Sequence, residues 1–398
     1  MSKTEKPSIR FHGFDDAWEQ RKLGDNIAEY TEKTTINNQY PVLTSSRRGI
    51  FFQTDYYDGN QIASADNTGY NIVPYGYFTY RHMSDDEIFH FNINDITENG
   101  IVSTLYPVFT TDENLDSRYL QYQLNYGKEF AKYAILQKQG GSRTYMYLNK
   151  LKELRLTIPN FVEEQKKISA YFMKLDNFIT IHQRKFEKLT NVKKSMLEKM
   201  FPQNGSCYPT VRFKGFTGPW ERRKFGDVFE EYSEKNRADL PPLTIIQGNG
   251  TIRRDESERA LQYDKASLSN YKVVNEGDLI VHLRSFEGGL EKANSQGIIS
   301  PAYHTFHGEG VDSRFYYTYF RSKNFIDTDL KPHVYGIRDG RSIDIEGMKT
   351  IEIPFTSYPE QKLIGDAIDS INTLISLQRR ELEKLQSIKK SLLEKMFV

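Results

Sequence analysis

The chain has 398 residues, of which 38% are hydrophobic and 13% aromatic, and its formal net charge is +1. This hydrophobic content excludes a disordered chain, and the length has room for two or three ordinary domains. The near-zero charge excludes a generally basic protein, so any nucleic-acid site must be a local patch, or a partner must share the work. The single cysteine, Cys207, excludes an intrachain disulfide framework.

Targeting signals are also missing from the sequence. No apolar run approaches the roughly 18 residues that a membrane span needs. The charged residues Lys3, Glu5 and Lys6 are followed by no apolar core of a signal peptide. We therefore expect a cytoplasmic protein.

The first block of the chain alternates strand-like runs with turns. Residues 18–32 predict a short helix, and residues 39–109 contain short runs rich in β-branched and aromatic residues, for example at 49–52 and 77–80. Residues 116–136 then predict a helix with Asp116 in its first turn. Hydrophobic and polar residues alternate up to Ile158, as in a half-buried strand.

A long helix is predicted next, over residues 160–201, because this stretch contains neither Gly nor Pro. Its apolar residues recur at steps of three and four, which is the seam of a coiled coil. A second stretch of the same kind ends the chain, and a Ser-x-x-Glu sequence from Ser357 to Glu360 predicts a capping box at its start. At an offset of 196 residues the two stretches place their seam residues at equivalent positions: Ile168, Phe172, Leu175, Ile179, His182 and Phe186 in the first, and Ile364, Ile368, Ile371, Ile375, Gln378 and Leu382 in the second.

The blocks repeat as well as the helices. Residues 10–14 (RFHGF) return as 212–216 (RFKGF), and residues 197–201 (LEKMF) return as 393–397. The matches are collinear, so the chain is a tandem duplication. We predict an α+β protein with four parts: domain 1 over residues 1–158, a central helix over 159–202, domain 2 over 203–355 and a C-terminal helix over 356–398.

The two helices are expected to form one antiparallel coiled coil. Each spans about 55 Å at ~1.5 Å per residue, which few monomeric domains need. The second helix must return along the first to bring the two seams together; the alternative is that each helix packs on its own block. Polar seam residues fix register, and matched ends place His182 close to Gln378 and Lys193 opposite the region of Ile368.

Signatures of catalysis are absent from the sequence. It contains no phosphate-binding P-loop, no dinucleotide fingerprint, no nucleophile elbow and no His/Cys metal cluster. The Asn-Pro-Pro-aromatic signature of amino-methyltransferases is missing too. We therefore expect a non-enzyme.

Two similar but divergent blocks on a rigid spacer suit a ligand with two different, separated subsites, and double-helical DNA is such a ligand. Loops at equivalent places carry Arg, Ser and Tyr, which suit guanine edges and phosphates. The candidate DNA-binding residues are Tyr80, Arg81, Arg143 and Tyr145 in block 1, and Arg284, Ser285, Arg338 and Arg341 in block 2.

The order block, helix, block, helix resembles the specificity subunit of type I restriction–modification enzymes. The resemblance covers nearly the whole chain and rests on Trp18 followed by Lys22-Leu23-Gly24-Asp25, on the GIVS and GIIS segments at 100–103 and 297–300, and on Glu-Gln-Lys at the start of each helix. One departure is Thr104, where block 2 has the family's proline, Pro301.

The resemblance implies two target-recognition domains, each reading one half of a bipartite asymmetric DNA site. It implies that the helices set the gap and dock two modification subunits, which bring S-adenosylmethionine and methylate adenine. Restriction subunits would bring ATP and Mg²⁺, and this chain itself would bind no cofactor. From the residues alone, a coiled-coil protein–protein adaptor with two ligand-binding modules and a single-chain enzyme with an unrecognised site stay open.

Overall fold

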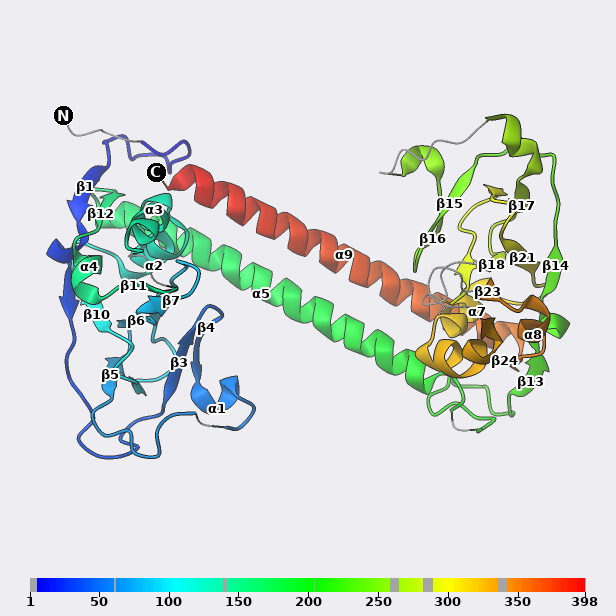
Figure 1. Cartoon of the computed structure of the whole chain (residues 1–398), viewed down its shortest axis with the longest axis horizontal. Helices are drawn as coiled ribbons and strands as arrows, with labels where there is room; N and C mark the ends of the chain where they lie inside the picture. Colours follow the sequence, from blue (N-terminus) through cyan, green and yellow to red (C-terminus); the bar gives the residue numbers. More distant parts are fainter. Residues whose placement is uncertain are drawn as a thin grey trace. The chain divides into compact units, whose positions relative to one another are not determined.

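Two helices, α5 (Val162–Lys199) and α9 (Tyr358–Met396), are the longest elements of the chain (Figure 1). The computed structural model describes residues 6–60, 62–138, 142–203, 205–257, 265–281, 289–335 and 342–397. It divides into two compact units: unit 1 takes residues 1–182 and 381–398, and unit 2 takes residues 183–380. Strand β12 ends at Ile158 and β24 ends at Phe355, but the units divide within the helices, so each unit contains part of each helix.

The core of unit 1 joins a small antiparallel sheet to helices. The sheet has the strand order β2-β10-β6-β8, and two-stranded ribbons pair β1 with β12, β3 with β4, β5 with β9 and β7 with β11. The strands are β1 (Glu19–Lys22), β2 (Ile27–Glu29), β3 (Leu43–Ser46), β4 (Gly49–Phe52), β5 (Asn71–Pro74), β6 (Phe78–Thr79), β7 (Met83–Ser84), β8 (Asn92–Ile93), β9 (Asn99–Val102), β10 (Val108–Thr111), β11 (Thr144–Tyr145) and β12 (Arg155–Ile158). The shorter helices are α1 (Gln53–Tyr56), α2 (Ser117–Tyr126), α3 (Lys128–Leu136) and α4 (Leu148–Lys152).

Unit 2 repeats this plan. Its sheet has the order β14-β21-β18-β19, and its ribbons pair β13 with β24, β15 with β16, β17 with β20 and β22 with β23. The strands are β13 (Glu221–Lys224), β14 (Glu230–Tyr232), β15 (Leu243–Ile246), β16 (Gly250–Arg253), β17 (Lys272–Val274), β18 (Leu279–Val281), β19 (Glu291–Lys292), β20 (Gly297–Ile299), β21 (His304–His307), β22 (Val334–Tyr335), β23 (Ser342–Ile343) and β24 (Glu352–Phe355). The shorter helices are α6 (Phe225–Val228), α7 (Ser313–Phe320) and α8 (Ile345–Lys349).

The predicted α+β class is thus confirmed, but two elements differ from prediction. Residues 18–32, predicted as a helix, form β1, one 3₁₀ turn and β2, because β1 pairs with β12 and β2 with β10. The helix predicted over 116–136 is two helices, since Gly127 has an extended backbone (φ −72°, ψ 139°) between α2 and α3. Asp116 caps α2 as expected, with its side chain accepting a hydrogen bond from the backbone N–H of Tyr119 at 2.8 Å.

The long helices pack antiparallel within each unit. In unit 1, Phe172 stacks on Phe397 (ring centroids 5.8 Å apart), and Asp176 lies 2.6 Å from the ammonium of Lys389. A later residue of α5 thus contacts an earlier residue of the C-terminal segment, which is the antiparallel direction. In unit 2 the guanidinium of Arg379 lies 5.5 Å from the ring centroid of Phe186. The predicted seam residues are buried or half-buried. His182 belongs to unit 1 and Gln378 to unit 2, so their pairing stays a prediction.

A buried ion pair fastens each block to its long helix. In unit 1 the Glu164 carboxylate accepts two hydrogen bonds from Arg10, at 2.6 and 2.7 Å, and one from the indole N–H of Trp18 at 3.4 Å. In unit 2 Glu360 accepts the same three bonds from Arg212 and Trp220. We call each set of three residues a clamp: Arg10, Trp18 and Glu164 in unit 1, and Arg212, Trp220 and Glu360 in unit 2. The Glu360 carboxylate also accepts a hydrogen bond from Thr356, so it takes part in the clamp instead of the capping box predicted with Ser357.

Candidate nucleic-acid interface

Two loops of block 1 that carry candidate DNA-binding residues meet in a two-stranded ribbon. Strand β11 pairs with β7, with Tyr145 opposite Met83 and Thr144 opposite Ser84. The backbone N–H of Met146 extends the ribbon by donating to the carbonyl of His82 at 2.7 Å. Residues 81–84 and 143–146, some 60 positions apart in sequence, therefore lie side by side, and their exposed members form one surface.

Tyr80 does not lie on that surface. Its side chain is fully buried, and its hydroxyl donates to the carbonyl of Met146 at 2.8 Å. Burial also raises the pKa of the Tyr80 phenol. The strand alternation places Tyr80 in the core and Arg81 outside, so Tyr80 anchors the ribbon and is omitted from the interface proposed below.

The exposed side of the ribbon combines cations with stacked aromatic rings. Arg81 is exposed, and Arg143 donates from Nε to Asp85 at 2.8 Å, which raises the pKa of the guanidinium. The rings of Tyr145 and Tyr147 stack on each other with centroids 5.8 Å apart, and they lie 6.1 and 4.9 Å from the imidazole of the buried His82. The tyrosines are 37% and 48% exposed, which leaves apolar ring surface next to the cations.

A cavity of about 240 Å³ adjoins Arg81. Its lining includes Tyr56, Tyr57 and Tyr106 together with Arg47, which forms an ion pair with Asp86 and holds the pKa of that carboxyl well below its usual range. Arg47 lies in the turn between β3 and β4. Neither arginine of this hairpin is among the residues expected from the sequence, although Arg47 and Arg48 directly precede the strand-like run at 49–52.

The block 2 candidates Arg284, Ser285, Arg338 and Arg341 lie outside the described residues. What the structure does describe there is a short ribbon in which Tyr335 of β22 pairs with Ser342 of β23. Tyr335 is 60% exposed. Unit 2 therefore also presents an exposed tyrosine on a ribbon, but the ribbon pairs different segments of the block from those in unit 1.

The described residues contain neither a candidate metal site nor a candidate membrane-spanning helix. Within them, His, Cys, Asp and Glu side chains form no group of three that could hold a metal ion. No helix among the described residues combines the length and the apolarity that crossing a membrane requires.

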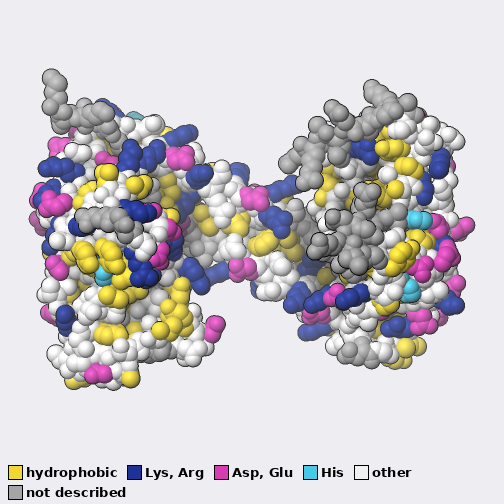
Figure 2. All heavy atoms as spheres, in the orientation of Figure 1, with side chains coloured by type: hydrophobic (Ala, Val, Ile, Leu, Met, Phe, Trp, Pro, Cys, Tyr) yellow, Lys and Arg dark blue, Asp and Glu magenta, His cyan; other side chains and the backbone are white. Residues whose placement is uncertain are grey.

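The helix pair exposes apolar side chains at equivalent positions in the two units. Phe178 and Ile181 of α5 are 52% and 38% exposed in unit 1, and their counterparts at the 196-residue offset, Leu374 and Leu377 of α9, are 48% and 50% exposed in unit 2. Hydrophobic side chains among Lys and Arg are visible on the helix surface in Figure 2. Because Phe178 precedes the seam residue Ile179 and Leu374 precedes Ile375, both faces lie on the same side of their seams.

Two similar α+β blocks, each clamped to long helices that pack antiparallel, define the class of molecule: a duplicated two-domain scaffold. Residues 15–191 match the family model of the type I restriction modification DNA specificity domain. This part of the chain is therefore similar to the DNA specificity domain of type I restriction–modification enzymes.

Two relatives and one solved structure carry the same likeness. A putative type I restriction enzyme MjaX specificity subunit of Methanocaldococcus jannaschii is 22% identical over 300 residues, 70% of this chain and 67% of the relative. The MjaVIII specificity subunit of the same organism is 25% identical over 315 residues, 74% of this chain and 72% of the relative. The crystal structure of a type I S subunit from M. genitalium has a TM-score of 0.60 at 12% identity over 99% of both chains, which shows a shared fold.

Proposed function

We propose that the chain recognises a bipartite, asymmetric DNA site, with each block reading one half and with α5 and α9 setting the distance between the halves. The carrying observation is the β7–β11 ribbon, which gathers Arg81, Arg143 and Tyr145 on one exposed surface. Arginine suits guanine edges and phosphates, and tyrosine suits phosphates and sugar faces.

The contrast between frame and loops supports two different half-sites. The clamp of Arg10, Trp18 and Glu164 is reproduced in unit 2 by Arg212, Trp220 and Glu360. The ribbons that carry exposed tyrosines, in contrast, pair different segments in the two units. A retained frame with divergent loops is what a duplicated module needs in order to read two different sequences.

The chain would contribute recognition without catalysis. Methyl transfer to adenine from S-adenosylmethionine, and ATP-dependent and Mg²⁺-dependent restriction where restriction subunits are present, would be carried out by partner subunits in the cytoplasm. Two modification subunits are the partners that the duplicated helix faces fit, because two equivalent apolar faces can bind two copies of one protein.

Replacing Arg81 or Arg143 by Ala should weaken duplex binding by about 1–3 kcal/mol and relax specificity in one half of the site only. The truncated guanidinium would no longer hydrogen-bond a base edge. The measurement is the affinity of the chain, with its methyltransferase partner, for a panel of duplexes substituted at each position of the site found by methylome sequencing.

Arg155→Ala is the matched control, because Arg155 is exposed on β12, outside the ribbon. Altered specificity in both halves would show that the blocks do not read independently. If neither the chain nor its complex binds duplex DNA, the protein–protein adaptor becomes the better explanation.

Phe178→Asp or Leu374→Asp should lower the number of bound modification subunits from two to one, because each substitution places a charge in one of the two equivalent apolar faces. The mass of the complex in solution reports the stoichiometry. Thr180→Asp, on an exposed neighbouring position of α5, is the control for added charge. Loss of both subunits from either single variant would contradict two independent docking faces.

A further inference from the structure

Lys389 in unit 1 and Lys193 in unit 2 occupy equivalent seam positions but have different surroundings. In unit 1 the ammonium of Lys389 lies 2.6 Å from Asp176 and 4.6 Å from the ring centroid of Tyr126. Tyr122 contributes a second ring, at 5.7 Å, and its hydroxyl donates to Asp176 at 2.6 Å. This lysine is thus neutralised inside the protein by a carboxylate and two aromatic faces.

In unit 2 the lysine at the same position, Lys193, has lost these partners. At the 196-residue offset, Asp176 is replaced by Asn372, Tyr122 by Thr318 and Tyr126 by Ser322. Lys193 is half-buried, and burial together with the charge of Arg321 lowers the pKa of its ammonium. Among the described residues, Lys193 has no carboxylate within ion-pair distance.

A basic cavity of about 570 Å³ occupies this place in unit 2. Its walls come from α5, α9, α7, β19 and the turn between β15 and β16, and five of its lining side chains are cations: Lys193, Lys292, Arg314, Arg321 and Arg379. Asn249, Asn294 and Asn372 add neutral hydrogen-bonding groups.

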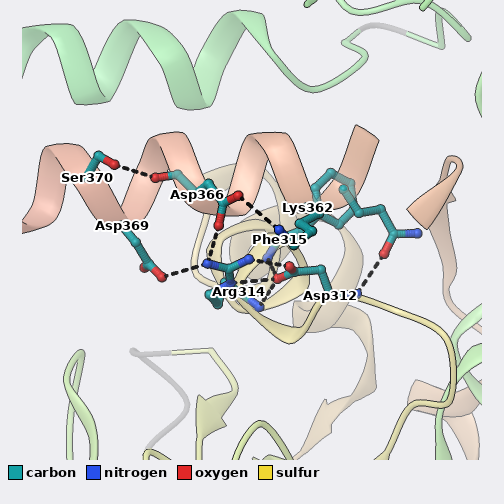
Figure 3. A network of polar contacts seen from close by, with 8 residues as sticks. Asp312, Arg314, Phe315, Lys362, Asp366, Asp369 and Ser370 are labelled. Atoms are coloured by element: carbon teal, nitrogen blue, oxygen red, sulfur yellow. Dashed lines mark hydrogen bonds and ion pairs between the residues drawn. The ribbon is translucent and has the colours of Figure 1, made fainter. Parts of the chain in front are cut away.

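Two of these cations are already balanced within unit 2. Arg314 bonds Asp312 and Asp366 at 2.6 Å and reaches Asp369, the carboxylate that also lines the cavity (Figure 3). Arg321 pairs with the buried Glu291. For Lys193, Lys292 and Arg379 the described part of the chain holds no ion pair with a carboxylate, so the cavity carries an excess of positive charge.

We propose that this cavity binds a backbone phosphate of the recognised DNA, with Lys193 as the central charge. The inference rests on the proposed DNA recognition and assigns it a sequence-independent contact. A phosphate would supply the anion that Asp176 supplies to Lys389 in unit 1. Lysine acts toward phosphate as a point charge, and Arg379 and Lys292 would surround the same group.

The asymmetry favours DNA over a partner protein. A partner that docks twice needs the same site in both units. The cavity of about 460 Å³ at the equivalent place in unit 1 holds the Asp176–Lys389 ion pair, whereas in unit 2 the described residues give Lys193 no carboxylate partner. The two halves of an asymmetric DNA site differ, so their backbone contacts are free to differ as well. In addition, Lys292 and Asn249 belong to the recognition block and not to the helices.

The test measures duplex affinity as a function of salt for the full chain with its methyltransferase partner. Asn372→Asp places a carboxylate at the position equivalent to Asp176, where it should form an ion pair with Lys193. Lys193→Met removes the positive charge of the lysine. Each variant should reduce the slope of log affinity against log salt by about 1, equally for cognate and non-cognate duplexes. The matched control, Lys389→Met, should leave the slope unchanged.

Two further arms identify the source of the anion. A duplex series with single neutral methylphosphonates should contain one position that weakens the wild type but not Asn372→Asp, and such a position would confirm a DNA phosphate. Stabilisation of the wild type by inorganic phosphate, without any such position, would overturn the DNA assignment in favour of a free anion. Unchanged salt slopes in both variants, or a loss of methyltransferase binding in their place, would also overturn it. If the wild type binds no duplex, the proposed function fails, and that outcome is distinct from these.

Discussion

Glu164→Ala should destabilise unit 1 by about 3–5 kcal/mol, because it leaves a buried cation without its partner. The Glu164 side chain is 0% exposed and that of Arg10 is 13% exposed. The bidentate bond to Glu164 raises the pKa of Arg10, so the guanidinium cannot escape the cost by losing its proton. The indole N–H of Trp18 loses its acceptor in the same step.

The measurement can follow unit 1 alone, since the chain has two tryptophans, one in each unit. In a Trp220→Phe background, Trp18 fluorescence during urea unfolding reports the free energy of unfolding of unit 1. Glu153→Ala is the control, because its ion pair with Lys22 is exposed and is worth less than about 1 kcal/mol. A loss below ~1 kcal/mol for Glu164→Ala would show that the clamp does not hold block 1.

The clamp links the stability of block 1 to the proposed recognition of DNA. Glu164 lies in the first turn of α5, whereas Arg10 and Trp18 precede the first strand of the block. The block is therefore held at one place on the helix by three hydrogen bonds to a single carboxylate. A chain with a loosened clamp would present its half of the interface at a less defined distance along the spacer.

The sequence predicted best the elements that have a regular spacing of apolar residues and that occur in both repeats. The helix predicted over 160–201 is α5, from Val162 to Lys199, because a seam of steps of three and four is a property of a helix by itself. The clamp was also visible, as Arg10 and Glu164 recur at 212 and 360, although its pairing was not predicted. The helix predicted over 18–32 was wrong because the strands found there depend on partners 80 or more residues away, β12 and β10, which a local sequence pattern does not contain.

The candidate interface was less predictable than the fold. A loop sequence such as Thr79-Tyr80-Arg81-His82 shows which side chains are polar but not which of them point to solvent. Their orientation depends on which strand the segment pairs with and in which register. In the structure, Tyr80 and His82 are buried, and Arg81 between them is exposed. The cavity around Lys193 could not be foreseen from one repeat. It becomes visible when the surroundings of Lys193 are compared with those of Lys389.

Phe397→Ala should also cost unit 1 about 3–5 kcal/mol, because it removes a buried aromatic ring from the core. Phe397 is 4% exposed, and its ring lies 5.8 Å from Phe172 and 5.7 Å from Tyr119, both fully buried. Its counterpart Phe201 packs in the same way on Phe315, at 5.0 Å, within a continuous stretch of chain.

Backbone pairing supports this equivalence of the chain end with an internal segment. The N–H of Ile9 donates to the carbonyl of Lys395 at 3.1 Å, as the N–H of Val211 donates to that of Lys199 at 2.9 Å. Residues around Ile9 and Lys395 thus pair in unit 1 as residues around Val211 and Lys199 pair in unit 2. Urea unfolding followed by Trp18 gives the free-energy loss, and Leu136→Ala, at a 78% exposed position, should change it by less than about 0.5 kcal/mol. A similarly small loss for Phe397→Ala would show that the last turn of α9 is detachable from the core.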